Sequence, residues 1–165
     1  MLRFTEVVTT KENEDARRGV LTLRFEDRRR SRMRARLDDG REAALLLPHG
    51  TILRDGDRLR APDEGEVAIV RAAAQTLSVV HCADPLMLAR AAYHLGNRHI
   101  PVQLGAGWLA YEHDHVLDGM VTDMGLAVDT RVAPFEPEAG GYGRSSGATG
   151  GHEHHHHHHD HGHGH

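Results

Sequence analysis

The sequence predicts an α+β fold built from three parts, which differ in how their apolar residues are spaced. Residues 1–73 contain short alternating segments separated by turn residues, as in a small all-β domain. Residues 74–138 mix strand-like with helix-like periodicity, and residues 139–165 are rich in Gly, Ser and His. We therefore expect two folded domains followed by a linker and a histidine-rich tail.

Alternation of apolar and polar side chains marks the strands of the N-terminal part. In residues 19–25 every second residue from Leu21 onward is apolar, so the apolar side chains share one face, as a half-buried strand requires. Residues 33–37 are expected to pair with residues 42–47, because Asp39-Gly40 between them is a hairpin signal. The remaining strand candidates, separated by turns at Asp55-Gly56 and Glu64-Gly65, are residues 51–53, 57–61 and 66–72. Strands of this length and spacing predict a small barrel or sandwich.

Arginine dominates the basic residues and is densest between Arg28 and Arg36. Such a cluster can mark a surface for polyanions. However, Met33 and Ala35 alternate with the arginines, which favours a half-buried strand with a solvated arginine face. The whole chain has 20 Lys and Arg against 24 Asp and Glu, and this balance argues against nucleic acid as the main partner.

The C-terminal part begins with a β-rich apolar run, residues 76–81, which leads into a helix. Asp84 is a natural N-cap for this helix, and Pro85 fits its first position. Apolar residues then recur at helical spacing until Gly96, which we expect to end the helix.

Three more strands and a second helix complete this part. The strand candidates are residues 100–104, 108–112 and 126–132. Asp114 is expected to cap the second helix and Gly125 to end it. The resulting β-α-β-β-α-β order is the ferredoxin-like arrangement. Residues 134–151 turn to Pro, Gly, Ser and Glu, and are expected to form a linker.

Cysteine usage and hydropathy indicate the compartment. Cys82 is the single cysteine, so no disulfide can form within one chain. Residues 1–10 lack the apolar run of a signal peptide, and no segment approaches the roughly eighteen apolar residues of a membrane span. We expect a cytoplasmic protein that does not enter a membrane.

The tail is the most distinctive segment of the chain, because its last fourteen residues include ten histidines. It has no apolar residue to bury, so we expect it to be disordered without metal. Neutral imidazole binds nickel, copper and zinc, which makes these histidines candidate metal ligands. The alternative is an expression tag, but Gly, Asp and Glu interrupt the tract and favour a native segment. The tail histidines are His152, His154, His155, His156, His157, His158, His159, His161, His163 and His165.

Four histidines in the folded part are further candidates: His94, His99, His113 and His115. His113 and His115 would face one side if the preceding strand continued through them. Alternatively, Asp114 caps a helix and the two flanking imidazoles are only exposed. His94 falls in the last turn of the first helix, where a ligand and a structural role are equally compatible with its position.

His99 is the strongest candidate, because it follows a turn and a turn histidine has no packing reason to be there. One histidine cannot hold a transition metal, which takes roughly four to six donors. A two-fold dimer would bring the same histidine from both subunits to its axis.

Three segments resemble a known family. They are YHLGNRHIPVQL (93–104), YEHDHVLDGM (111–120) and APFEPE (133–138). In this order and spacing they resemble the UreE family of urease accessory proteins, which are nickel metallochaperones. The resemblance implies an N-terminal β domain and a ferredoxin-like metal-binding domain that pairs head to head in a homodimer. It also implies, as partners, the urease apoprotein and its other accessory proteins, including the maturation GTPase.

The resemblance further implies that His99 binds Ni(II) at the dimer interface, and that His94, His113 and His115 have auxiliary roles. A second hypothesis is a general metal buffer that stores nickel, copper or zinc on its tail. A third is an enzyme that uses Cys82 or the His113-Asp114-His115 cluster. No P-loop, dinucleotide glycine pattern, HExxH or GxSxG motif supports catalysis, so we expect the protein not to be an enzyme.

Overall fold

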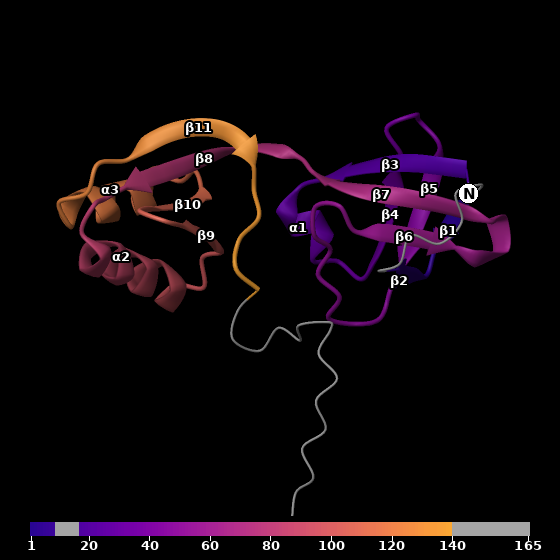
Figure 1. Ribbon diagram of the computed structural model, residues 1–165, viewed down its shortest axis with the longest axis horizontal. Helices are drawn as coiled ribbons and strands as arrows, with labels where there is room; N and C mark the ends of the chain where they lie inside the picture. Colours follow the sequence, from indigo (N-terminus) through magenta and orange to yellow (C-terminus); the bar gives the residue numbers. More distant parts are fainter. Residues whose placement is uncertain (9–16, 140–165) are drawn as a thin grey trace, which may run out of the picture.

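The computed structural model describes residues 1–8 and 17–139, which form two lobes connected by β7 and β8 (Figure 1). The N-terminal lobe contains β1 (Leu2–Phe4), β2 (Glu6–Val8), β3 (Arg17–Leu23), α1 (Phe25–Arg28), β4 (Arg32–Arg36), β5 (Glu42–Leu46), β6 (Arg58–Ala61), the 3-10 helix η1 (Pro62–Glu64) and β7 (Glu66–Ala72). The C-terminal lobe contains β8 (Ala74–His81), α2 (Pro85–Asn97), β9 (Val102–Gly105), β10 (Trp108–Glu112), α3 (His115–Asp123) and β11 (Asp129–Pro134).

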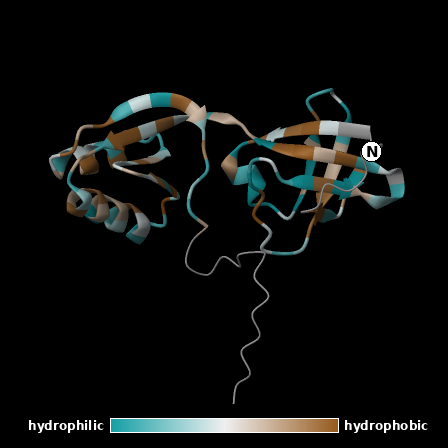
Figure 2. Cartoon of the chain, viewed as in Figure 1, coloured by the Kyte–Doolittle hydropathy of each residue, from teal (hydrophilic) through white to brown (hydrophobic). Residues whose placement is uncertain are grey.

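Two sheets form the N-terminal lobe. One has the strand order β1-β5-β4 and the other β2-β6-β7-β3. The predicted hairpin between β4 and β5 is confirmed, with Gly40 at a φ of 89° in its turn. Side chains from both sheets meet in one core, in which Phe4, Leu21 and Leu59 are fully buried. Along several strands of both lobes, hydrophobic residues are interspersed with hydrophilic ones (Figure 2).

Two expectations for this lobe were wrong. Residues 51–53 are not a strand: Leu53 reaches the core from a loop, and its backbone N–H donates to the carbonyl of Arg28 at 2.9 Å. A short apolar run indicates burial, but it does not distinguish a strand from a loop. Phe25 begins α1 instead of continuing β3, because its backbone N–H donates to the Gln75 side chain at 2.9 Å. The lobe is therefore mainly, but not purely, β.

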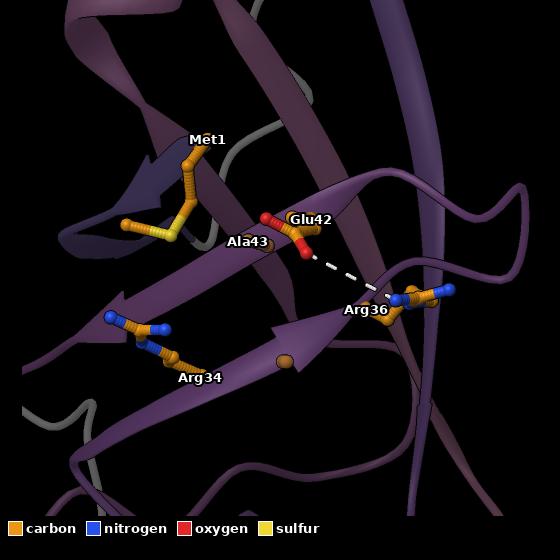
Figure 3. A pocket seen from close by; sticks show the side chains of 6 residues that line it. Met1, Arg34, Arg36, Glu42 and Ala43 are labelled. Carbon is orange, nitrogen blue, oxygen red and sulfur yellow. Dashed lines mark ion pairs between the residues drawn. The ribbon is translucent and has the colours of Figure 1, made fainter.

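The second half of the arginine-rich segment forms β4 as predicted, whereas Arg28 belongs to α1 and is buried. Arg34 and Arg36 are exposed, whereas Met33 and Ala35 are partly buried and pack against the core. These arginines and Met1 border a shallow pocket, where an ion pair joins Arg36 to Glu42 (Figure 3). The pocket has no histidine or cysteine in its lining, so it is not a candidate transition-metal site.

The C-terminal lobe has the predicted β-α-β-β-α-β order. Its sheet is antiparallel, with the strand order β11-β8-β10-β9. Both helices pack against one face of this sheet, in a core that includes Val80, Leu109, Leu95 and Val121. Two strands start later than expected, β9 at Val102 and β11 at Asp129. None of the helices in the described ranges has the length and apolar character needed to cross a membrane.

The opposite face of the same sheet meets the N-terminal lobe. Phe25 and Phe135 pack edge to face, with ring centroids 5.7 Å apart. Arg28 is fully buried; its guanidinium donates to the carbonyls of Leu53 and Phe135 and forms an ion pair with Glu136. Residues 134–138 therefore pack between the lobes, and the expectation that a linker begins at Pro134 was wrong.

Candidate metal centre

Helix α2 positions two of the candidate histidines. Asp84 caps the helix as predicted, and its Oδ1 accepts a hydrogen bond from the backbone N–H of Leu86 at 2.9 Å. The buried face of the helix includes Ala91 and Leu95, which anchor it to the sheet. His94 lies in the last turn, as the spacing predicts, and the structure shows that it is exposed.

The end of α2 places His99 in an unusual backbone conformation. Its φ is 60°, and it is the one non-glycine residue with a positive φ among residues 1–8 and 17–139. The N–H of His99 donates to the carbonyl of Gly96 at 2.9 Å, and that of Ile100 donates to Leu95 at 3.1 Å. These two bonds form a Schellman motif, in which His99 occupies the position that glycine usually takes. Gly96 does not end the helix as expected: α2 continues to Asn97, and the left-handed residue that follows the helix is His99, three positions after Gly96.

Helix α3 ends in the same motif but with a glycine. Gly125 has a φ of 87°, its N–H donates to Thr122, and the N–H of Leu126 donates to Val121. A residue with a Cβ pays about 1–2 kcal/mol for the left-handed conformation. Strain of this kind, kept at one helix end and avoided at the other, points to a functional side chain at His99.

The His99 imidazole is accessible. The residue is exposed, and within the described part of the chain no hydrogen bond or ion pair involves its ring. Both ring nitrogens are thus available to a ligand, and the helix end fixes the direction in which the side chain leaves the backbone.

His113 and His115 flank the N-cap of α3. Strand β10 ends at Glu112 and His115 is the first residue of the helix, so the alternative in which a strand continues through both histidines was wrong. Asp114 caps the helix: its Oδ1 accepts from the N–H groups of Val116 and Leu117, at 2.8 and 3.1 Å. These backbone hydrogen bonds, that from Leu117 first, lower the pKa of the Asp114 carboxyl. The Asp114 carboxylate therefore acts as the N-cap of α3.

A partly buried polar network holds His113. Its Nδ1 lies 3.0 Å from the Ser78 hydroxyl and 3.0 Å from Oδ2 of Asp118. The hydroxyl of Tyr111 donates to Oδ1 of the same carboxylate at 2.8 Å. Burial raises the pKa of Tyr111, and the hydrogen bond to Asp118 raises it further. Three members of this network, Ser78, Tyr111 and Asp118, were not predicted from the sequence. The one available signal was the spacing of Asp118, one helical turn after Asp114.

Strand register brings the candidate histidines to one end of the sheet. Val102 of β9 lies opposite Tyr111 of β10, so the chain leaving α2 at His99 and the chain entering α3 at His113 emerge together. His81 is paired with Trp108 at the other end. Among the described residues of one chain, no group of three or more His, Cys, Asp or Glu side chains is arranged to hold a metal ion.

Both parts of the chain match models of one protein family. The model for the N-terminal domain of the UreE urease accessory protein matches residues 4–73, and the model for its C-terminal domain matches residues 75–165. The chain belongs to the UreE family of urease accessory proteins. UreE proteins are accessory proteins without catalytic activity, so the enzyme hypothesis is rejected.

Individual UreE proteins are similar along most of the chain. The urease accessory protein UreE of Vibrio parahaemolyticus is 45% identical over 157 residues, which cover 92% of this chain and 98% of that protein. UreE of Escherichia coli O157:H7 is 49% identical over 148 residues, covering 90% and 94% of the two chains. UreE of Pseudomonas putida (strain W619) is 51% identical over 137 residues, covering 82% and 85%.

The tail histidines and Cys82 were also predicted as candidate functional residues. The tail histidines between His152 and His165 lie outside the described residues. Cys82 is half-buried next to the Gly107 turn, where its N–H donates to the carbonyl of Gly107 at 3.0 Å. It is part of the turn that connects β8 to α2, which fits a packing role.

Proposed function

We propose that this UreE-family protein is a nickel metallochaperone that delivers Ni(II) for assembly of the urease active site. The observation that carries the proposal is the left-handed backbone of His99, with an exposed imidazole at the end of α2. A histidine whose backbone is held at a helix end loses less freedom on binding a metal than one on an unstructured chain, and divalent nickel is among the ions that imidazole favours. Cu(II) and Zn(II) would compete for the same nitrogens.

A homodimer would complete the site. A transition metal takes roughly four to six donors, and a two-fold axis would supply a second His99 from the partner. On the outer side of α2, Leu86 is 57% and Tyr93 68% exposed, which gives the ferredoxin-like domain an apolar surface that a second copy could cover. We assign auxiliary metal binding to His94, His113 and His115, and initial capture to the tail histidines.

The proposed division of the chain follows these roles. Residues 1–73 form a β-rich domain, 74–138 a ferredoxin-like domain for metal binding and dimerisation, and 139–165 a linker and histidine-rich tail. We place the protein in the cytoplasm, with apo-urease and the other urease accessory proteins, including the maturation GTPase, as its partners. The β-rich domain and the dimer face would offer these partners a fixed surface.

Calorimetric titration with nickel tests the central residue. His99→Ala should lose the tightest binding phase and keep the weaker phases, since tail binding must first overcome the entropy of ordering the chain. His49→Ala is the matched control, because His49 is also an exposed histidine in a turn but does not itself have a positive φ. An unchanged tight phase in His99→Ala would show that the wrong histidine has been assigned.

A general divalent-metal buffer is the second candidate, favoured by the ten tail histidines alone. Removing residues 151–165 separates the two functions. If the protein is a chaperone, the chain without residues 151–165 should still support urease activation in nickel-rich medium and should support it less when nickel is scarce. A buffer would lose its whole effect in both media.

A further inference from the structure

The carboxylate of Asp118 binds two side chains of its own chain. Oδ1 accepts the hydrogen bond of Tyr111 at 2.8 Å, and Oδ2 lies 3.0 Å from Nδ1 of His113. We propose that Asp118 is a positioning residue that holds His113 in the tautomer and orientation required for metal capture. The inference rests on the proposed function, because it takes His113 to be an auxiliary nickel ligand.

Two partners lie at Nδ1 of His113, the Ser78 hydroxyl and Oδ2 of Asp118, each 3.0 Å away. The hydroxyl can donate or accept a hydrogen bond, whereas an ionised carboxylate only accepts, so Asp118 favours the tautomer that carries its hydrogen on Nδ1. The neutral imidazole then has its free electron pair on Nε2, and Nε2 is the atom that can bind a metal. Metal-binding histidines commonly donate their second ring N–H to a carboxylate in this way, which also orients the ring.

Burial makes the network rigid on one side and open on the other. Tyr111 and Ser78 are fully buried and lie opposite each other on β10 and β8. The side chain of Asp118 is 20% exposed, and that of His113 is 40% exposed. The Nδ1 side of the imidazole therefore contacts the protein, while part of the side chain remains exposed to solvent. Asp118 uses both oxygens internally, so its role is to orient a ligand and not to bind the metal.

Nuclear magnetic resonance of the metal-free, unsubstituted protein tests the tautomer without any variant. Long-range ¹H–¹⁵N correlations of the His113 ring should show the Nδ1–H form at a pH at which the ring is neutral. A ring that carries its hydrogen on Nε2 would overturn the inference.

Nickel affinity tests the effect on binding. The full-length chain is used with His99→Ala and with the ten tail histidines replaced by serine, so that only the weaker folded sites remain. In this background Asp118→Asn should weaken nickel binding by about 10–100-fold, the usual effect of losing such a partner. Asp123→Asn removes the same charge from an exposed position on the same helix, where no side-chain hydrogen bond or ion pair is found within the described residues. It should bind nickel unchanged.

The outcomes separate this inference from the proposed function. Full affinity in Asp118→Asn, or an equal loss in Asp123→Asn, would overturn the positioning role and leave nickel binding in place. If His113→Ala in the same background binds nickel unchanged, His113 is not a ligand and the inference fails. The proposed function would still be tested separately, by the loss of the tight phase in His99→Ala.

Discussion

Replacing His99 by glycine should stabilise the metal-free protein while removing its tight nickel site. The φ of 60° at His99 costs a residue with a Cβ about 1–2 kcal/mol. Glycine avoids this cost but loses about 0.5–1 kcal/mol more backbone entropy on folding. The free energy of unfolding should therefore rise by about 0.5–1 kcal/mol, which corresponds to an increase of about 1–4 °C in Tm for a chain of this size.

The end of α3 offers a matched control with the opposite sign. A Cβ added at Gly125 would meet no atom within 4 Å, so Gly125→His would be penalised by its backbone conformation alone. We expect this variant to lose about 0.5–1 kcal/mol. Urea denaturation followed by circular dichroism, with a chelator present, measures both variants against the unsubstituted protein.

Two results would refute this reasoning. A lower urea midpoint for His99→Gly, or shifts in the same direction for both variants, would show that His99 is not held under strain. A tight nickel phase that survives in His99→Gly would show that the strained side chain is not the ligand. The combination of greater stability and lost nickel binding is expected only if the strain is kept for function.

Two substitutions and one change of pH have outcomes that the contacts of the protein and the chemistry of imidazole predict. Glu136→Ala should lower the free energy of unfolding by about 3 kcal/mol, because the fully buried Arg28 loses its carboxylate partner. Urea denaturation measures the effect, with substitution of the exposed Glu138 by alanine as the control. A loss below about 1 kcal/mol would contradict the role of the ion pair. Asp114→Ala should destabilise α3 at neutral pH. Folding lowers the pKa of Asp114, so the stabilisation by its carboxylate is complete above the ordinary pKa of 3.8 and is lost as the pH falls through the lower pKa of the folded state. The difference in stability between the unsubstituted protein and Asp114→Ala should therefore shrink below pH 3.8. A difference that widens there would be inconsistent with capping. Nickel binding should weaken as the pH falls through about 6.5, where protons compete for imidazole; an affinity that stays flat from about pH 8 to 5 would indicate carboxylate or backbone ligands.

Local patterns in the sequence predicted the elements that local physics determines. The Asp39-Gly40 hairpin and the N-caps at Asp84 and Asp114 are confirmed, because each depends on residues within a few positions of itself. The β-α-β-β-α-β order is also confirmed, since periodicity separates its helices from its strands.

Contacts between distant residues account for what the sequence did not reveal. Phe25 leaves its strand because it meets Gln75 and Phe135, and Leu53 is buried by tertiary packing of a loop. The composition around Glu136 predicted a linker, but Glu136 forms an ion pair with the buried Arg28 of the other lobe. Likewise, the left-handed turn falls at His99 and not at the expected glycine, which the general preference for glycine at such turns did not reveal.

The most direct test of the central claim is the number of tight nickel ions per chain. Metal analysis combined with size-exclusion chromatography and light scattering should be done on the full-length chain with its ten tail histidines replaced by serine. If His99 residues from two subunits anchor one ion, the protein should elute as a dimer with about one tight nickel ion per two chains, and with none after His99→Ala. A monomer that binds about one tight nickel ion per chain would contradict the shared site.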